Sequence, residues 1–374
     1  MICFLICLIL IVAGLRPFNF KPQNKVEWLL GERGVRFFGQ GMIYGPGPLD
    51  SKRYKYLNGD SNSLVFWAQA GPQSKRAPAR IISFWDGQKS ESLFIGQRKS
   101  ELVFWYKNVT RTSHKDLGYR GMVLGSLSDK DVKHFIGITS GNQGTAVYLD
   151  GNLAKNRPDF LLRPENIEMS GNIVLGNSPT GEDDWKGRLM GLAIYNRSLT
   201  SDEISQSYLS WKAEGHPHSQ EEGLVALYLF DEGNGQRVRN HTGPGPHLEI
   251  PVTFRPLRKS LLSPPWRDFR LSPSYLSDAF INIAGFVPFG FFLTALFLKT
   301  RRLAKRRVLI VTLLGGAMSL AIELLQFFLP TRNSNLNDLL CNIVGTALGI
   351  AAFSICRPFF ATRKWAWLAG KKID

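Results

Sequence analysis

The chain has 374 residues, a formal net charge of +16 and a hydrophobic fraction of 44%. Its four cysteines, Cys3, Cys7, Cys341 and Cys356, all fall in or beside apolar segments, which excludes a disulfide framework for the middle of the chain. The sequence also lacks a nucleotide-binding loop, a zinc-spaced cysteine and histidine set and a hydrolase nucleophile elbow. This length is enough for two folding units.

The chain opens on an apolar stretch, residues 2–15, which ends at Arg16. Such a stretch is shorter than the roughly 20 residues of an ordinary transmembrane helix and lies in the length range of a signal peptide. No basic residue precedes it and no convincing cleavage pattern follows it. We therefore favour a transmembrane anchor over residues 1–20, with a cleaved signal peptide as the alternative.

Residues 34–215 alternate short apolar runs with turn residues, which is typical of an all-β sandwich with little helix. Turn pairs such as Asp150-Gly151 and Gly141-Asn142 favour chain reversals. Strands are expected at residues 63–70, 79–85, 92–96, 102–106, 134–139, 146–149, 173–175 and 189–195.

Carboxylates in the loops of this region offer oxygen ligands for a structural Ca²⁺, which is the one cofactor considered. The candidates are Asp150, Asp183 and Asp184, with Glu182 beside them, and the alternative is that they are solvated loop residues. A retaining glycoside hydrolase of this shape needs two closely spaced carboxylates, usually on an E-x-D-x-E strand, and none is found.

Several ordered motifs in this region resemble the laminin-G or concanavalin A-like lectin/glucanase sandwich. They are HFIGI at residues 134–138, YLDG at 148–151, GRL at 187–189 and IYNRSLT at 194–200 with Glu203-Ile204. The resemblance implies a jelly-roll fold whose members include carbohydrate binders, protein binders, hydrolases and structural modules, and fold alone does not choose among them.

Residues 216–277 are expected to hold additional strands and a basic, proline-rich linker. The run LVALYLFDEGNG at residues 224–235 resembles a segment that often opens such sandwiches, and it either adds an edge strand or begins a second sandwich. The basic residues of 251–277 suit either contact with anionic phosphates or a solvated spacer.

Three apolar segments, residues 279–298, 308–329 and 339–356, are each long enough to cross a bilayer core of roughly 30 Å. They predict a three-helix transmembrane bundle at residues 278–356. Basic residues fill the connection at 299–307 and the tail at 357–374, so the positive-inside rule places both in the cytoplasm. The sandwich is then extracytoplasmic and both termini are cytoplasmic, although Arg16, Lys21 and Lys25 oppose this orientation.

Polar and small residues recur every three or four positions in each apolar segment, which gives each helix one polar face. On the segment 308–329 this face is expected to include Thr312, Gly316, Ser319 and Glu323. At about 1.5 Å per residue, the polar members share one depth near the outer boundary. The predicted polar cluster contains Asp278, Asn282, Glu323, Gln326, Arg332, Asp338 and Asn342. One arginine does not neutralise three carboxylates, so either Glu323 is protonated or a cation joins the site.

The same residues carry a second resemblance. The pattern runs from Asp278-x3-Asn282-x2-Gly285 through Glu323-x2-Gln326 and Pro330-x-Arg332 to Asp338-x3-Asn342-x2-Gly345-x3-Gly349, and it resembles the VanZ-like membrane protein family. The resemblance implies a role in the bacterial cell envelope, a first span at the N-terminus and no settled reaction. It therefore places the sandwich between the first and second spans.

Three interpretations stay open. In the first, a non-enzymatic envelope protein of the cytoplasmic membrane binds a glycan or an envelope protein through the sandwich, and a lipid-linked ligand or none through the bundle. In the second, an intramembrane enzyme or transporter acts on a lipid-linked precursor or phospholipid headgroup, with Glu323 as the candidate catalytic residue. In the third, the polar cluster is structural: Asp338 caps a helix, Arg332 pairs with Asp278, and Glu323 bonds to Asn282 or Asn342. Membrane lipids are the expected partners, and nucleic acid is not.

Overall fold

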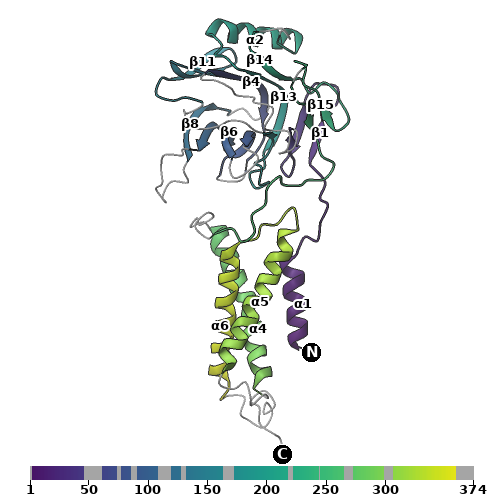
Figure 1. Cartoon of the computed structure of the whole chain (residues 1–374), viewed down its shortest axis with the longest axis vertical. Helices are drawn as coiled ribbons and strands as arrows, with labels where there is room; N and C mark the ends of the chain where they lie inside the picture. The colour runs from purple at the N-terminus through teal and green to yellow at the C-terminus, as the bar shows by residue number, and fades with distance from the viewer. Residues whose placement is uncertain are drawn as a thin grey trace, which may run out of the picture. The chain divides into compact units, whose positions relative to one another are not determined.

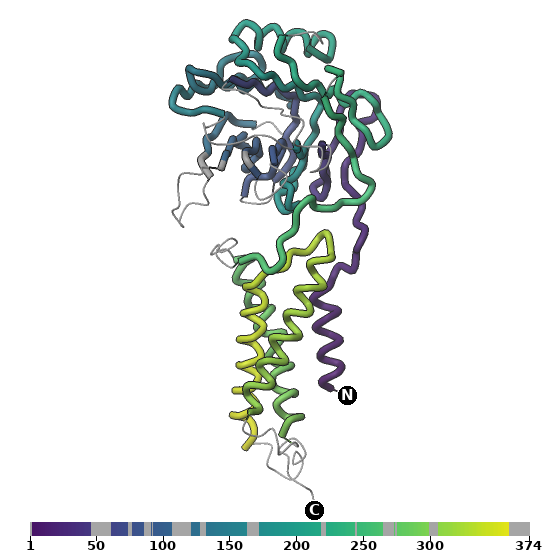
Figure 2. Tube along the Cα trace, in the orientation of Figure 1, coloured from purple at the N-terminus to yellow at the C-terminus, as the bar shows by residue number. Residues whose placement is uncertain are grey.

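The computed structural model describes residues 2–45, 61–73, 77–85, 91–107, 119–127, 132–162, 172–217, 222–243, 245–264, 273–298 and 306–358. Most of the predicted basic tail, residues 359–374, lies outside this description. The chain divides into two compact units, drawn in Figure 1 and traced in Figure 2. The membrane unit contains Met1–Phe20 and Lys259–Asp374, and the sandwich unit contains Lys21–Arg258.

The sandwich unit is built from two antiparallel sheets, which confirms the predicted fold class. The first sheet runs β1 (Val26–Trp28), β2 (Val35–Phe38), β13 (Lys186–Tyr195), β4 (Asn62–Ala70), β9 (Lys133–Gly141), β10 (Gly144–Leu149) and β11 (Asn152–Arg157). The second runs β15 (Arg237–Val238), β16 (Leu248–Glu249), β3 (Ile43–Tyr44), β12 (Asn172–Leu175), β5 (Ala79–Trp85), β6 (Glu91–Arg98), β7 (Glu101–Lys107) and β8 (Tyr119–Ser126).

The core lies between the sheets because side chains alternate between the two faces of each strand. In β2, Val35 and Phe37 are buried whereas Arg36 and Phe38 are exposed. Phe37 packs against Trp185, which is fully buried and donates its indole N–H to the side-chain oxygen of Gln97 at 2.8 Å. Trp185 therefore belongs to the core.

The segment after β13 also joins this sandwich. β14 (Leu224–Tyr228) pairs antiparallel with β13, and β16 pairs with β3 in the second sheet. The LVALYLFDEGNG run thus contributes to the same sandwich and does not begin a second one.

Helix α2 (Ser201–Glu214) covers part of the outer face of the first sheet, as Figure 1 shows, and it was not predicted. It begins with a capping box in which Thr200 and Glu203 exchange side-chain and backbone hydrogen bonds, and it ends at Gly215, whose φ is +78°. Trp211 and Ile204 are buried against the sheet, and Trp67 of β4 stacks on Tyr208.

The membrane unit contains α1 (Ile2–Gly14), α4 (Pro273–Phe297), α5 (Arg307–Phe327) and α6 (Leu336–Cys356). In α4, α5 and α6, stretches of 23, 21 and 21 residues are long and apolar enough to cross a membrane, which confirms the three predicted transmembrane helices. Helix α1 has 13 residues and is shorter than these spans.

Glycines bring α4 and α6 into close contact. A Cβ atom on Gly345 would overlap the carbonyl oxygen of Ile283, and one on Gly349 would overlap that of Val287. The facing Gly290 of α4 lies equally close to the backbone of Thr346. Small residues are therefore required where these backbones meet, which accounts for the Gly345-x3-Gly349 spacing.

The buried face of α5 shares Ser319 and Glu323 with the predicted face and differs at its other positions. It runs through Val311, Gly315, Ser319, Ile322 and Glu323, and a Cβ on Gly315 would overlap the Thr346 side chain. Thr312 and Gly316 lie one position to the side and are only partly buried. The prediction gave polarity too much weight, because Val311 and Ile322 fill the interface as well as the small residues do.

Candidate functional site

A pocket of about 480 Å³ opens at the end of the bundle where α4 and α6 begin. All seven residues of the predicted polar cluster line it. The other lining residues are Leu10, Ala13, Gly14, Tyr275, Ile281, Gly285, Phe286, Ile322, Asn335 and Asn337. Four helices and the connection between α5 and α6 thus contribute to one cavity.

Glu323 is the most deeply buried carboxylate of the cluster, with 1% of its surface exposed. Its Oε2 atom accepts a hydrogen bond of 2.8 Å from the backbone N–H of Asn335, just before α6 begins. The predicted bond to Asn282 or Asn342 is wrong, because the chain returning from α5 brings a backbone donor closer. Glu323 therefore holds the start of α6 while it lines the pocket.

Two further cluster residues bind the N-terminal segment of the same unit. The carboxamide of Gln326 donates to the carbonyl oxygen of Gly14 at 2.8 Å, and the Nε of Arg332 donates to that of Arg16 at 2.7 Å. The predicted pair between Arg332 and Asp278 is therefore wrong. The last carbonyls of a helix have no partner within it, so Gln326 satisfies one of them at the end of α1.

Asn342 combines one satisfied and one unsatisfied polar atom. Its Nδ2 donates to the Ser319 hydroxyl at 2.8 Å, across the contact between α5 and α6. Its Oδ1 is buried and has no hydrogen-bond partner among the described residues. Only 4% of Asn342 is exposed, so this acceptor faces the low-dielectric interior beside the pocket. Leaving such an atom without a donor costs about 1–3 kcal/mol.

The remaining carboxylates lie at the two helix starts. Asp278 is exposed on α4, and Asp338 lies in the first turn of α6. The N-cap of α6 is Asn335, whose side chain accepts from the N–H of Asn337, so the prediction that Asp338 caps this helix is wrong. Asp338 still lies where the helix dipole favours negative charge.

The end of α5 is held by Lys259, which the sequence assigned to the linker. Its Nζ donates to the carbonyl oxygens of Phe327 at 2.8 Å and Leu329 at 2.5 Å. A cation at the C-terminus of a helix compensates the partial negative charge of the unpaired carbonyls.

Of the pocket residues that the motif analysis missed, Asn335 carried a signal as a helix N-cap, whereas Leu10 and Ala13 carried none.

The sandwich carboxylates considered for Ca²⁺ have protein partners. Asp150 accepts from the Phe135 N–H and contacts His134 Nδ1, both at 2.9 Å. Asp183 lies 3.4 Å from the Arg80 guanidinium, in the connection between β12 and β13. Asp184 lies beside Asp183, so Asp150 is at one turn of the chain and the other two candidates are at another. A structural Ca²⁺ stays a prediction.

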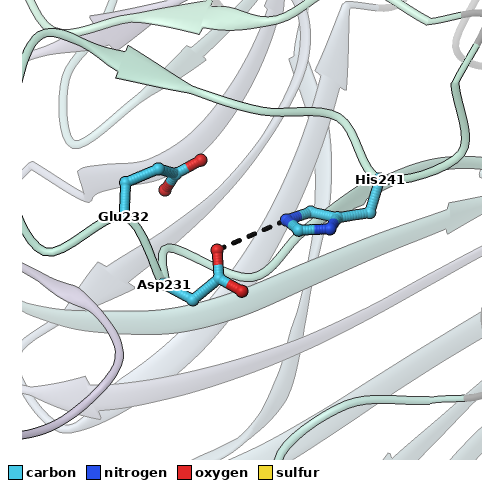
Figure 3. A group of neighbouring side chains, drawn as sticks. All are labelled: Asp231, Glu232 and His241. Carbon is cyan, nitrogen blue, oxygen red and sulfur yellow. Dashed lines mark ion pairs between the residues drawn. The ribbon is translucent and has the colours of Figure 1, made fainter.

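A different group, Asp231, Glu232 and His241, brings carboxylate and imidazole atoms within 4.8 Å of one another. Figure 3 draws these three side chains. Asp231 Oδ1 lies 3.3 Å from His241 Nε2, and Glu232 Oε1 accepts from the Arg239 N–H at 2.6 Å. These contacts tie together the loops that flank β15. The sequence analysis did not single out this group.

The fold defines a class of protein: an integral membrane protein with a lectin-type β-sandwich and a C-terminal helical bundle. Residues 48–205 match the family model described as the concanavalin A-like lectin/glucanases superfamily, and residues 224–357 match the one described as VanZ/LLP1. The two resemblances drawn from the sequence are therefore confirmed. The VanZ/LLP1 match includes the whole polar cluster.

Two similar solved structures share low sequence identity with the chain. The Trypanosoma rangeli sialidase matches with 17% identity and a TM-score of 0.39, over 50% of this chain and 29% of the sialidase. The botulinum neurotoxin serotype D binding domain matches with 13% identity and a TM-score of 0.38, over 53% of each chain. No function is transferred from either. No curated protein matches the chain significantly.

Proposed function

We propose that the protein is a binding protein of the bacterial cytoplasmic membrane. Its bundle pocket binds the polar headgroup of a lipid or lipid-linked molecule, and its sandwich, outside the cytoplasm, binds a glycan or an envelope partner. The observation that carries the first part is the pocket itself, which gathers carboxylates, carboxamides and one guanidinium at one end of a transmembrane bundle. Polar groups in a membrane are costly, so their convergence favours a functional site.

The chemistry of the pocket restricts the ligand. The buried Asn342 Oδ1 atom needs a donor, and the seven cluster residues contain three carboxylates against one guanidinium. A headgroup with hydroxyl or ammonium donors satisfies the amide oxygen and compensates the acidic groups. A phosphate on the same headgroup suits the remaining donors of Arg332, because its Nε and Nη2 both donate to the Arg16 carbonyl while Nη1 and the second N–H of Nη2 stay available.

Orientation supports an opening toward the outer leaflet. Gly14 contacts Gln326, so the end of α1 lies at the pocket end of the bundle, and the basic connection at 299–307 joins α4 and α5 at the opposite end. The positive-inside rule places that basic connection in the cytoplasm. The pocket then faces the extracytoplasmic side.

Binding is favoured over catalysis because of how Glu323 is held. A general acid or base needs to reach the substrate proton at about 2.6–3.2 Å. One carboxylate oxygen of Glu323 is already committed to the Asn335 N–H. The alternative function is an enzyme or transporter acting on the same headgroup through Glu323, and it is tested by the same variants.

The test is lipid-resolved native mass spectrometry of the full-length protein, delipidated and then offered phosphatidylethanolamine, phosphatidylglycerol or undecaprenyl phosphate separately. Asp278→Asn and Asn282→Ala change pocket groups. Ser354→Ala is the control, because the Ser354 hydroxyl donates to the Ile350 carbonyl within α6 and Ser354 does not line the pocket. Headgroup-selective retention that is lost in the pocket variants and kept in the control supports the proposal. Equal lipid retention by all variants contradicts it, and conversion of a bound lipid that Glu323→Gln abolishes establishes the enzyme instead.

A further inference from the structure

The outer face of the first sheet carries a second cavity, in the sandwich unit. It has a volume of about 430 Å³, and its side-chain lining comes mainly from Arg36, Phe38, Gln69, Lys186 and Arg188. Small-ligand sites commonly have volumes of about 300–1,000 Å³. Helix α2 covers the neighbouring part of this face, where its Trp211 packs in the same cluster as Trp67 of β4. The residues that line the groove are not in this cluster, so the groove occupies sheet surface that α2 leaves uncovered.

Strand register explains why these cations converge. Arg188 of β13 lies opposite Arg36 of β2 on one side and opposite Gln69 of β4 on the other. Lys186 lies opposite Phe38 in the next pair along the same strands. Directly opposed like charges destabilise a sheet, so a stable fold does not require this arrangement.

Partners inside the protein compensate only part of this charge. Glu32 lies 3.2 Å from Arg188 and also pairs with Lys133. Glu27 of β1 lies opposite Arg36 on its other side, and no ion pair joins them among the described residues. The described residues that line the groove include three cations and no carboxylate. The groove is therefore electropositive.

An aromatic ring lies among the cations. Phe38 is 38% exposed, and the Arg36 guanidinium lies 4.6 Å from the centre of its ring. A large exposed apolar ring at the edge of a charged groove gives a ligand a flat surface on which to stack. The arginines supply planar forks that match carboxylate or phosphate groups bidentately.

We propose that this groove binds an acidic glycan, a saccharide chain bearing carboxylate or phosphate groups. The inference rests on the proposed glycan binding by the sandwich and names its surface and ligand class. The ring of Phe38 stacks on a sugar face while Arg36 and Arg188 hold the anionic substituent. An anionic membrane surface is the alternative occupant, but a recessed groove with an aromatic side chain suits a chain laid into it, whereas membrane-binding patches present protruding lysines.

The test measures binding of the full-length protein, held in phosphatidylcholine nanodiscs, to oligogalacturonate, to its neutral methyl ester and to a phosphomannan, a saccharide chain that bears phosphate groups. The key variant is Arg36→Gln/Arg188→Gln. The matched control is Arg98→Gln/Arg157→Gln, which removes the same charge from partly exposed residues outside the groove. Phe38→Ala tests the stacking, and unchanged thermal unfolding of each variant establishes that it is folded.

At least one acidic glycan is expected to bind at least about tenfold more tightly than the methyl ester, with the difference lost in the groove variant and kept in the control. Equal loss in both double variants overturns the inference, because net charge then explains the binding. Equal binding of acidic and neutral chains overturns the inference that the groove selects acidic glycans, but it leaves the proposal that the sandwich binds a glycan in place. Binding of no glycan removes the glycan proposal as well, and binding only to phosphatidylglycerol vesicles assigns the groove to membranes. The lipid assay on the bundle is independent of all these outcomes.

Discussion

The Gln326 side chain donates a hydrogen bond to the carbonyl oxygen of Gly14, joining residues 312 positions apart in the sequence. Arg332 donates to Arg16 two residues further along. The short helix α1 is thus held at its C-terminal end by the same polar residues that line the pocket. The pocket is therefore complete only with the N-terminal helix in place, which gives α1 a structural role in the membrane unit.

Replacing Gln326 with leucine removes the donor and leaves the Gly14 carbonyl without its partner. Hydrogen bonds between membrane helices contribute about 0.6 kcal/mol on average, so we expect a loss of about 1 kcal/mol in the stability of the bundle. Thermal unfolding of the full-length protein in detergent measures this loss. Ser354→Ala is the control, and equal melting temperatures for the two variants would show that the Gly14 bond contributes nothing.

Gly349→Ala tests the contact between α4 and α6. The added methyl group would meet the Val287 carbonyl oxygen and, at 2.7 Å, the Phe291 nitrogen. Both are backbone atoms of α4, so the helices must separate, and we expect a loss of about 3 kcal/mol or more. Gly316→Ala is the control, because its nearest neighbour is the end of the Ile343 side chain at 3.6 Å. Detergent-resistant folding, monitored by size exclusion, should fail for the first variant and persist for the second.

Much of this architecture follows from the sequence because its physical causes are local. Strand β5 has the predicted bounds, 79–85, since an apolar run between turn residues has few alternatives. Six of the seven polar cluster residues lie on helices, and they line one pocket because helical spacing fixes their face and helix length fixes their depth.

The hydrogen-bond partners of these residues did not follow from the sequence. Arg332 binds the Arg16 carbonyl and Glu323 binds the Asn335 N–H, and both contacts depend on how the chain turns outside the helices. Pattern analysis pairs side chain with side chain and overlooks backbone groups, although unsatisfied backbone groups are plentiful at helix ends. Helix α2 was missed for a different reason: Thr200 and Glu203 were recognised as part of a family motif and not as a capping box.

Arg80 and Glu91 form a buried ion pair in the second sheet. The Arg80 Nε lies 3.2 Å from Glu91 Oε2, and the Ser83 hydroxyl donates to Glu91 Oε1 at 2.5 Å. Burial raises the pKa of Glu91 above its usual value of 4.5, and Arg80 opposes that rise. Arg80→Met leaves the carboxylate buried without its cation, so we expect a loss of about 3–5 kcal/mol at neutral pH.

The pH dependence of the stability loss in Arg80→Met distinguishes the loss of the cation beside Glu91 from a loss of packing. A carboxyl group with a raised pKa in the folded state contributes most to stability below about pH 4.5, and this contribution falls as the pH rises through the folded-state pKa. The defect of Arg80→Met should therefore shrink as the pH is lowered toward 4.5, and Glu91→Gln should partly rescue it. Thermal unfolding followed by tryptophan fluorescence measures both effects. A defect that is constant with pH would assign the loss to the contact of Arg80 with the Phe94 ring. Arg98→Met is the control, because Arg98 forms an ion pair that is more exposed than that of Arg80.

Glu203 gives the opposite pH dependence. Hydrogen bonds from Arg197, at 2.6 and 3.0 Å, and from the Thr200 N–H lower its pKa from 4.5 to about 2. A carboxylate with a lowered folded-state pKa stabilises the protein above pH 4.5, and the stabilisation is lost as the pH falls from 4.5 toward 2. Because the pair is partly exposed, solvent screens it, and Glu203→Gln is expected to cost only about 1 kcal/mol at pH 7.

The difference between wild type and Glu203→Gln should narrow as the pH falls from 4.5 to 2, since protonated Glu203 resembles the variant. Unfolding of the sandwich by urea across this pH range measures the narrowing. Asp159→Asn is the matched control: it breaks a bidentate pair with Arg157 that is more exposed and caps no helix, so its effect should be near zero at every pH. If Glu203→Gln cost no more stability at pH 7 than Asp159→Asn does, neither the ion pair of Glu203 nor its capping box would contribute measurably to the stability of the fold.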